Sequence, residues 1–351
     1  MVISSAGYRH LVSRAPATIQ AGRAQYLTAQ EAATTHAARK SAQLFAQQAE
    51  KAFAASAQTG MIDLDTSLNA DGDSPATTRN LLARYLVIRE GEEFEFSAHA
   101  TCVLFYVIKG SGRSFQEDEV IQWGSGDVFV FPGGEPILNE APATDAVLFV
   151  VTDEPFVSMT GCSVPSRENA RCKSTHYAAK TIQAKLEDMV EQRERELAAR
   201  KATAELKEMA EDKDTVEHSD LAEHSDSVEG ETIAAGAEPE ILIFTSSEFE
   251  NVGGVAPTLS AAIEMLDGGA QTQPHRHDVD TISLCLKSAG AYSMVETDRI
   301  EWKRNTVILT PAGASHCLHN VGDSRIFSFF VQDCGPRPVR TWQSDQRNQA
   351  E

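Results

Sequence analysis

Three histidines in the last third of the chain have the spacing of metal ligands. His275 and His277 are separated by one residue, and His316 begins a later apolar segment. Side chains two residues apart on a β-strand lie on the same face, so both imidazoles would point to one side of such a strand and Arg276 to the other. Imidazole suits iron, copper, nickel and zinc alike. The sequence therefore predicts a transition-metal site at His275, His277 and His316.

The histidines lie in the second of two β-rich blocks. Short β-branched and aromatic runs, separated by turn residues, occupy residues 80–152 and return at 240–333. A shift of 178 residues places Gly91 over Gly269 and His99 over His277. This internal duplication predicts two all-β domains of one architecture, at residues 75–178 and 239–340.

The motif residues resemble the cupin superfamily, whose two motifs are G-x5-H-x-H-x3-E-x6-G and G-x5-P-x-G-x2-H-x3-N. Seven residues match them in order, Gly269, His275, His277, Pro311, Gly313, His316 and Asn320, and a later glycine, Gly290, follows the first motif. Two positions depart from the motifs, because Thr281 replaces the glutamate and Asn305 replaces the second motif's opening glycine. The resemblance implies two tandem cupin barrels, which are jelly rolls also called double-stranded β-helices.

Without the motif's glutamate, three neutral imidazoles would leave about half of an octahedral metal shell open. Three-histidine iron sites are found in gentisate 1,2-dioxygenase-like bicupins. The resemblance thus implies an Fe(II)-dependent dioxygenase that cleaves a hydroxylated aromatic acid with dioxygen, although another divalent transition metal fits the same ligands. A cupin isomerase and a non-catalytic cupin that binds a metal or small molecule remain as alternatives.

The first barrel lacks most of this site. The alignment puts Ser97, Val103 and Ile137 at the positions of His275, Thr281 and His316, so His99 alone is kept. One imidazole among apolar neighbours cannot hold a divalent metal tightly. We therefore expect a structural barrel that serves packing or assembly of a homo-oligomer. Gentisate dioxygenases usually carry iron in the N-terminal barrel, so gentisate itself is a doubtful substrate.

Further residues are candidates for the pocket. Alternation carried on from His277 turns Thr281, Ser283 and Cys285 toward the barrel interior, where they would contact the substrate or fill the barrel. A substrate carboxylate would favour a bidentate arginine, and Arg325 is the candidate. His319 lies an odd number of residues from His316, which places it on the opposite face of a strand.

Two segments outside the barrels differ from them in amino-acid composition. Residues 1–60 predict a flexible N-terminus followed by an Ala-rich helix, which Thr28 and Glu31 would open with a capping box. Residues 179–238 predict a charged helix and then an acidic linker. The repeated EHSD of this linker carries His218 and His224, which we interpret as part of a disordered segment rather than a metal tract.

Composition excludes two classes of partner. The net charge of -20 and the lack of a basic cluster argue against nucleic acid, and no apolar run is long enough to cross a bilayer. Six scattered cysteines favour a reducing compartment, so we expect a cytoplasmic protein. The first 30 residues contain no Asp or Glu and carry Arg9, Arg14 and Arg23, which leaves a mitochondrial transit peptide as the alternative.

Overall fold

The computed structural model describes residues 23–31, 41–66, 74–214, 238–250, 253–288 and 290–333. The chain divides into two units, residues 1–40 and residues 41–351. In the first unit the expected capping box is confirmed. The Thr28 backbone N–H donates to Glu31 Oε2 at 2.7 Å, and the Glu31 N–H donates back to Thr28 Oγ1 at 3.2 Å.

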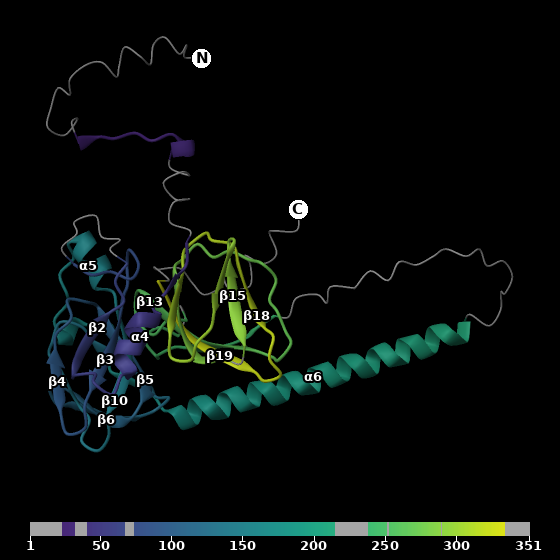
Figure 1. Ribbon diagram of the computed structural model, residues 1–351, viewed down its shortest axis with the longest axis horizontal. Helices are drawn as coiled ribbons and strands as arrows, with labels where there is room; N and C mark the ends of the chain where they lie inside the picture. The colour runs from purple at the N-terminus through teal and green to yellow at the C-terminus, as the bar shows by residue number, and fades with distance from the viewer. Residues whose placement is uncertain are drawn as a thin grey trace, which may run out of the picture. The chain divides into compact units, whose positions relative to one another are not determined.

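The first barrel of the second unit consists of two antiparallel sheets (Figure 1). Its six-stranded sheet runs, in spatial order, through β11 (Thr175–Tyr177), β8 (Val128–Pro132), β5 (Cys102–Lys109), β10 (Ala146–Thr152), β3 (Leu82–Ile88) and β2 (Gly60–Asp63). Its four-stranded sheet runs through β4 (Glu93–Phe96), β9 (Ile137–Glu140), β6 (Ser111–Gln116) and β7 (Glu119–Gly124). The helix α5 (Glu154–Thr160) and a short 3-10 turn (Arg167–Asn169) connect β10 to β11.

The second barrel repeats this plan. Its six-stranded sheet has the order β1 (Gln43–Leu44), β17 (Val307–Thr310), β14 (Thr281–Lys287), β19 (Ile326–Asp333), β13 (Leu259–Leu266) and β12 (Glu240–Phe244). Its smaller sheet contains β16 (Asp298–Glu301), β15 (Ala291–Val295) and β18 (His316–Asn320). The expected all-β fold of two tandem cupin barrels is confirmed.

The two barrels share one apolar core, which lies between their six-stranded sheets. On β3, Tyr85 and Val87 contribute to this shared core, whereas Leu86 and Ile88 fill the first barrel's own interior. Strand alternation thus gives each large sheet two buried faces. From the second barrel, Phe329 enters the shared core and packs against Tyr106 with ring centroids 4.8 Å apart.

Polar bonds also tie the barrels together. The Tyr85 hydroxyl donates to the Asn305 carbonyl oxygen at 2.7 Å. The buried Asp153 accepts hydrogen bonds from the Thr101 backbone N–H and, at 2.7 Å, from the Thr258 hydroxyl of the second barrel. These bonds satisfy polar groups that would otherwise be costly to bury.

The segment before the first barrel is folded onto the second. β1 pairs with β17, where Gln43 lies opposite Leu309 and Leu44 opposite Ile308. The helix α4 (Ala46–Phe53) follows, and Ala49 and Ala52 are buried in the shared core. The Ala-rich helix predicted in this region is therefore interrupted at β1, because the edge of β17 supplies hydrogen bonds that override helix propensity. Residues 41–60 are likewise part of the folded body and not a flexible tail.

The charged segment after the first barrel is helical, as expected. α6 (Ala179–Asp214) carries exposed side chains, including the Arg195–Glu191 pair one turn apart at 3.0 Å. Arg193 of α6 pairs with Glu240 of β12 at 3.3 Å, which attaches the helix to the second barrel. His218 and His224 lie outside the described residues.

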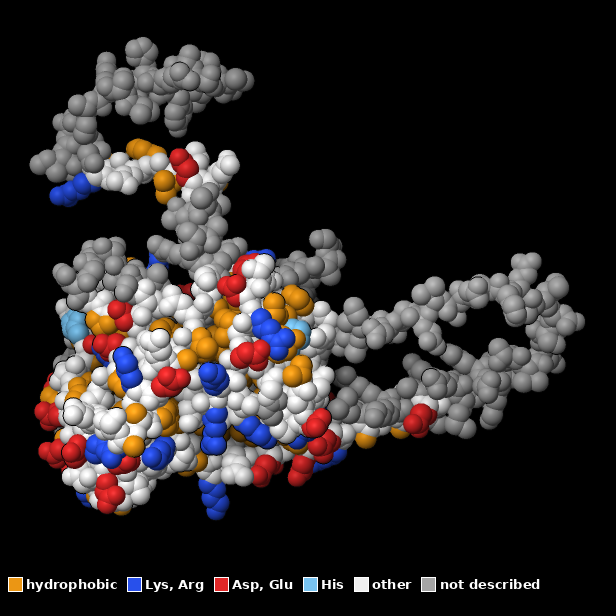
Figure 2. Space-filling view, in the orientation of Figure 1, with side chains coloured by type: hydrophobic (Ala, Val, Ile, Leu, Met, Phe, Trp, Pro, Cys, Tyr) orange, Lys and Arg blue, Asp and Glu red, His pale blue; other side chains and the backbone are white. Residues whose placement is uncertain are grey.

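The surface carries both signs of charge. Figure 2 shows acidic and basic side chains interspersed over the face drawn, as is usual for the exposed side of strands and helices. Within the described part of the chain, no helix is long and apolar enough to span a membrane.

We predict that Phe329→Ala will weaken the whole second unit. Phe329 is fully buried between the barrels, so its truncation should lower the free energy of unfolding by about 3–5 kcal/mol. Denaturant unfolding measures this loss. Val321→Ala is the control, because Val321 is 64% exposed and should change stability by less than about 0.5 kcal/mol. Equal effects of the two substitutions would contradict the shared core.

Candidate metal centre

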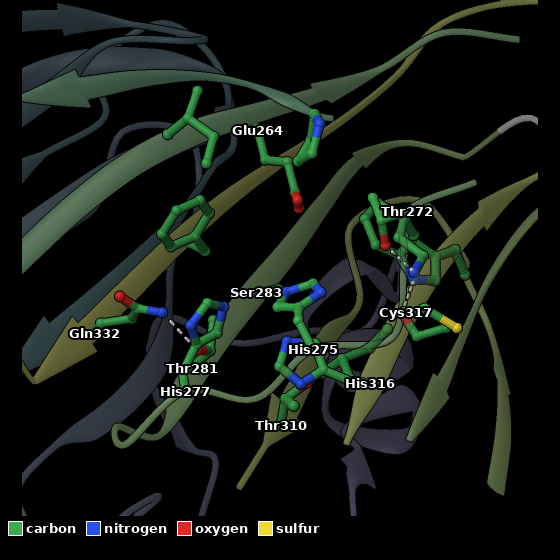
Figure 3. Close-up of a pocket in the computed structure, with 17 residues that line it drawn as sticks. Glu264, Thr272, His275, His277, Thr281, Ser283, Thr310, His316, Cys317 and Gln332 are labelled. Carbon is green, nitrogen blue, oxygen red and sulfur yellow. Dashed lines mark hydrogen bonds between the residues drawn. The ribbon is translucent and has the colours of Figure 1, made fainter. Parts of the chain in front are cut away.

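Three imidazoles converge on a cavity in the second barrel (Figure 3). Their ring centroids are 4.8 Å apart for His275 and His277, 4.3 Å for His275 and His316, and 5.1 Å for His277 and His316. One ring nitrogen of each histidine lies within 4.8 Å of the others'. Modest rotation of the rings would bring three nitrogens to the roughly 2.1 Å bond length of a transition metal.

Backbone pairing holds two of the rings together. His275 forms an isolated antiparallel bridge with His316 at the start of β18, and each backbone N–H donates to the other residue's carbonyl at 2.9 Å. His277 lies in the loop before β14, where its carbonyl accepts the Gly313 N–H at 2.7 Å. Residues 275–277 thus do not form the regular strand predicted from the sequence. Both imidazoles nevertheless face one cavity.

Hydrogen bonds fix the tautomers of two histidines. His275 Nδ1 lies 2.8 Å from the Gln273 carbonyl oxygen, and His316 Nδ1 lies 3.0 Å from the Ala314 carbonyl oxygen. A carbonyl oxygen only accepts, so each Nδ1 must carry the proton. The lone pair of each ring is therefore on Nε2, the arrangement that orients histidine for metal binding.

Burial keeps two of the rings neutral. It lowers the pKa of His277 to about 4 and that of His316 to about 4, and the neighbouring His275 ring adds to both shifts. Metal ions bind neutral imidazole, so protons do not compete for these two ligands near pH 7. The donor set fits iron(II), and it also fits other divalent transition metals.

The cavity is small and has mixed polarity. Its volume is about 90 Å³, and two of the predicted pocket residues, Thr281 and Ser283, line it. The Thr281 hydroxyl accepts a hydrogen bond from Gln332 Nε2 at 2.7 Å. The apolar part of the wall comes from side chains such as Ile308 and Phe330. The interior can therefore contact both a ring and its polar substituents.

Glu264 also lines this cavity, and the sequence analysis missed it. It lies on β13 and points toward the space that the imidazoles border (Figure 3). Burial raises its pKa to about 7, against the opposing effect of a hydrogen bond from Ser328. The signal was present in the duplication, since Glu264 aligns with the buried Leu86 of the first barrel.

Two other candidates do not reach the cavity. Cys285 does point inward, but it packs in the apolar core with Leu266 and Trp302, and burial raises its pKa to about 12. Arg325 donates to Asp267 at 2.5 Å and to Glu194 of α6 at 3.1 Å. These carboxylates hold the Arg325 guanidinium, and Arg325 is not among the residues that line the cavity.

His319 is engaged outside the lining as well. Its ring stacks on Tyr292 with centroids 4.5 Å apart, and its Nε2 lies 3.2 Å from Cys317 Sγ. This position agrees with the odd separation from His316, which puts the two side chains on opposite faces of β18.

Aromatic side chains fill the first barrel at the equivalent place. Phe105 stacks on Phe129 with centroids 4.5 Å apart, and Phe131 packs edge-on against both. Val103 and Ile137, which align with Thr281 and His316, are fully buried in this core. His99 is exposed at the rim of a separate surface depression.

These features define two tandem barrels of the cupin fold, with a three-histidine cluster in the second barrel. No family model matches the chain. It is similar to a gentisate 1,2-dioxygenase from a Streptomyces species, with 26% identity over 91 residues, or 26% of this chain and 25% of that protein. A 5-aminosalicylate 1,2-dioxygenase from a Comamonas species is 30% identical over 89 residues, or 25% of this chain and 24% of that protein. The matches thus span about a quarter of each relative's length.

Solved structures show the same fold. The salicylate 1,2-dioxygenase from Pseudaminobacter salicylatoxidans matches with a TM-score of 0.52 at 14% identity, over 78% of this chain and 76% of that one. A mutant of that enzyme in complex with gentisate matches with a TM-score of 0.53 at 12% identity, over 84% and 81% of the two chains. The expected resemblance to gentisate 1,2-dioxygenase-like bicupins is confirmed, and at this identity the structures establish the fold alone.

We predict that metal binding follows the second barrel. His277→Ala removes one of three ligands and should weaken the affinity for a divalent metal by at least about 100-fold. Metal content after gel filtration, measured by mass spectrometry, checks this. His99→Ala is the matched control and should leave the metal content unchanged. Metal loss in the His99 variant would place the site in the other barrel.

Glu264 predicts a pH-dependent difference in stability. In the metal-free protein its pKa of about 7 lies above the 4.5 of a solvent-exposed glutamate. Its stabilising contribution is therefore complete below pH 4.5 and is lost as the pH rises through 7. Glu264→Gln has no charge to bury, so it should gain on the order of 2 kcal/mol relative to the parent protein between pH 5 and pH 8. Denaturant unfolding at both pH values measures the change.

The control for this comparison is Glu95→Gln, because Glu95 is exposed on β4. Its substitution changes the charge without relieving burial. A stability difference for Glu264→Gln that did not vary with pH would show that the carboxyl is neutral, or well solvated, throughout this range.

Proposed function

We propose that this protein is a dioxygenase that uses iron(II), held by His275, His277 and His316, to oxidise a hydroxylated aromatic ring. The observation that carries the proposal is the convergence of three imidazoles, with no carboxylate in the set, on one cavity of the second barrel. The similarity to the gentisate and 5-aminosalicylate 1,2-dioxygenases supports the same chemistry.

The ligand set suits this reaction because it leaves positions free. Iron(II) bound there would supply open coordination positions for a substrate oxygen and for dioxygen. The chain's part is to keep the three rings oriented. The carbonyl oxygens of Gln273 and Ala314 do this for His275 and His316, since they fix which nitrogen carries the proton.

The cavity walls would position the ring. Ile308, Leu318 and Phe330 offer apolar surface and exclude water, while Thr281 and Ser283 offer hydroxyls on the side of β14. The bond from Gln332 to Thr281 holds one of these hydroxyls in place. A small planar substrate would then be confined between an apolar wall and the metal ligands.

The direct test is oxygen consumption. Protein loaded with iron(II) should consume dioxygen with a panel of hydroxylated benzenes, and zinc-loaded protein should not. His316→Ala should reduce the rate to the background. Product formed without oxygen consumption would favour a cupin isomerase. Tight ligand binding without any product would favour a non-catalytic binding protein.

We predict that Thr281→Glu will block this activity while metal binding is kept. Glutamate is the motif residue at this position, and it could occupy an open coordination site and add a negative charge. Oxygen-dependent turnover should fall at least about 100-fold, which corresponds to about 2.7 kcal/mol of activation free energy. Oxygen-electrode rates and metal content measure the two effects.

Thr281→Gln is the matched control for this variant. Glutamine has the size of glutamate but no charge, and its amide is a poorer metal ligand. It should retain more activity than Thr281→Glu. If Thr281→Glu turned over substrate as fast as the parent, the open three-histidine arrangement would not be needed for the reaction.

A further inference from the structure

The cavity offers no positive side chain to a substrate. Among the described residues, none of those that line it is lysine or arginine. Three described arginines of the second barrel make contacts elsewhere. Arg276 donates to the Gly313 carbonyl oxygen at 2.7 Å, Arg299 stacks over the Tyr292 ring at 3.7 Å, and Arg325 pairs with Asp267. A substrate carboxylate would thus lack the bidentate partner that usually recognises it.

The cavity instead presents a carboxyl group of its own. In the first barrel Leu86 lies opposite Leu148, and both side chains fill the apolar interior. In the second barrel the same pair of strands places Glu264 opposite Ser328, and the serine hydroxyl lies 3.3 Å from Glu264 Oε2. The duplicated position has therefore exchanged an apolar pair for a hydrogen-bonded polar pair. The exchange places a carboxyl group, that of Glu264, among the residues that line the cavity.

Charge balance favours a hydroxyl over a carboxylate at this place. Three neutral imidazoles leave a divalent metal with its full charge of about +2. An ionised Glu264 brings one negative charge, and a single ionised substrate hydroxyl brings the other. A hydroxylated acid would add a further negative charge that no cation of the lining balances, beside a carboxylate in a water-poor cavity.

Size limits the substrate too. A cavity of about 90 Å³ lies below the usual range of ligand sites, so it suits at most a single ring with small substituents. Side chains such as Leu318 and Phe330 supply the apolar surface that such a ring would contact.

From these observations we propose that the cavity takes a single-ring phenol without a carboxylate, and that Glu264 accepts a hydrogen bond from a hydroxyl of that substrate. This deepens the proposed function and rests on it. The proposed substrate differs from those in the names of the two similar proteins, gentisate and 5-aminosalicylate, because both of these are acids.

The test is binding of matched pairs to the full-length protein loaded with zinc(II), which removes turnover from the measurement. Hydroquinone is compared with 2,5-dihydroxybenzoate, and catechol with 2,3-dihydroxybenzoate, by titration calorimetry. Each pair differs by one carboxylate. The phenol of each pair should bind at least 10-fold more tightly than the acid.

Glu264→Gln tests the role of the carboxylate. Its amide keeps the size but loses the charge, so affinity for the phenols should fall about 5-fold and the preference over the acids should shrink to less than 3-fold. Glu301→Gln is the control, because Glu301 is exposed on β16 outside the lining, and it should leave both affinities unchanged. Thermal unfolding of each variant verifies that it is folded.

The outcomes separate this inference from the proposed function. Acids that bind as tightly as phenols, a preference that survives in Glu264→Gln, or no binding of either class to the zinc-loaded protein would each overturn the inference. If phenols bind as expected but iron-loaded protein consumes no oxygen with them, the dioxygenase proposal fails and the binding assignment stands. If the iron-loaded protein consumed oxygen with the acids alone, the dioxygenase proposal would stand and the assignment of a phenol without a carboxylate would fail.

Discussion

The packing of one six-stranded sheet against the other is the constraint on which the rest of the structure depends. Each large sheet buries both faces, one in its own barrel and one in the shared core around Phe329. Burial of apolar surface is the dominant stabilising contribution to folding. Because the shared core buries so much apolar surface, the second barrel remains stable with a polar-walled cavity in its interior. Its own apolar cluster is correspondingly smaller than that of the first barrel.

The two halves therefore share one architecture, but the interior of the first is packed and that of the second contains a cavity. The first barrel fills its interior with Phe105, Phe129 and Phe131, which stack and pack edge-on. At matching positions the second barrel places Thr281 opposite Thr310, where the first has Val103 opposite Phe131. Replacing a large apolar pair by two small polar side chains removes volume and adds hydroxyls. A packed interior and a ligand cavity thus differ by a few substitutions on the same strands.

The electrostatics of the cavity are consistent with a cation at its centre. Burial holds His277 and His316 in the neutral form, with lone pairs available, and it also raises the pKa of Glu264. Without a positive charge, a carboxyl in this environment is costly to ionise. A divalent metal at the histidines would reverse that effect on Glu264, because an opposite charge nearby favours the ionised form. The charge of a metal held by the three histidines would therefore favour the ionised form of Glu264.

Much of the fold and part of the candidate site could be predicted from the sequence. The 178-residue repeat gave two all-β barrels, since repeated alternation of apolar side chains and turn residues is a local property of the chain. The spacing of His275 and His277, with His316 at the second motif, sufficed to expect that the three rings face one cavity. The charged composition after Ala179 sufficed for a helix.

The tertiary structure decided what depends on contacts between distant segments. β1 pairs with β17 across more than 260 residues, which no local propensity at Gln43 encodes. Arg325 pairs with Asp267 of its own barrel and with Glu194 of α6, and the second partner became available only when the helix reached the second barrel. In the sequence Glu264 is one polar residue within an apolar strand, and only the folded barrel places its side chain at the cavity. The sequence determines which side chains are available, and the long-range pairing of strands decides which of them meet.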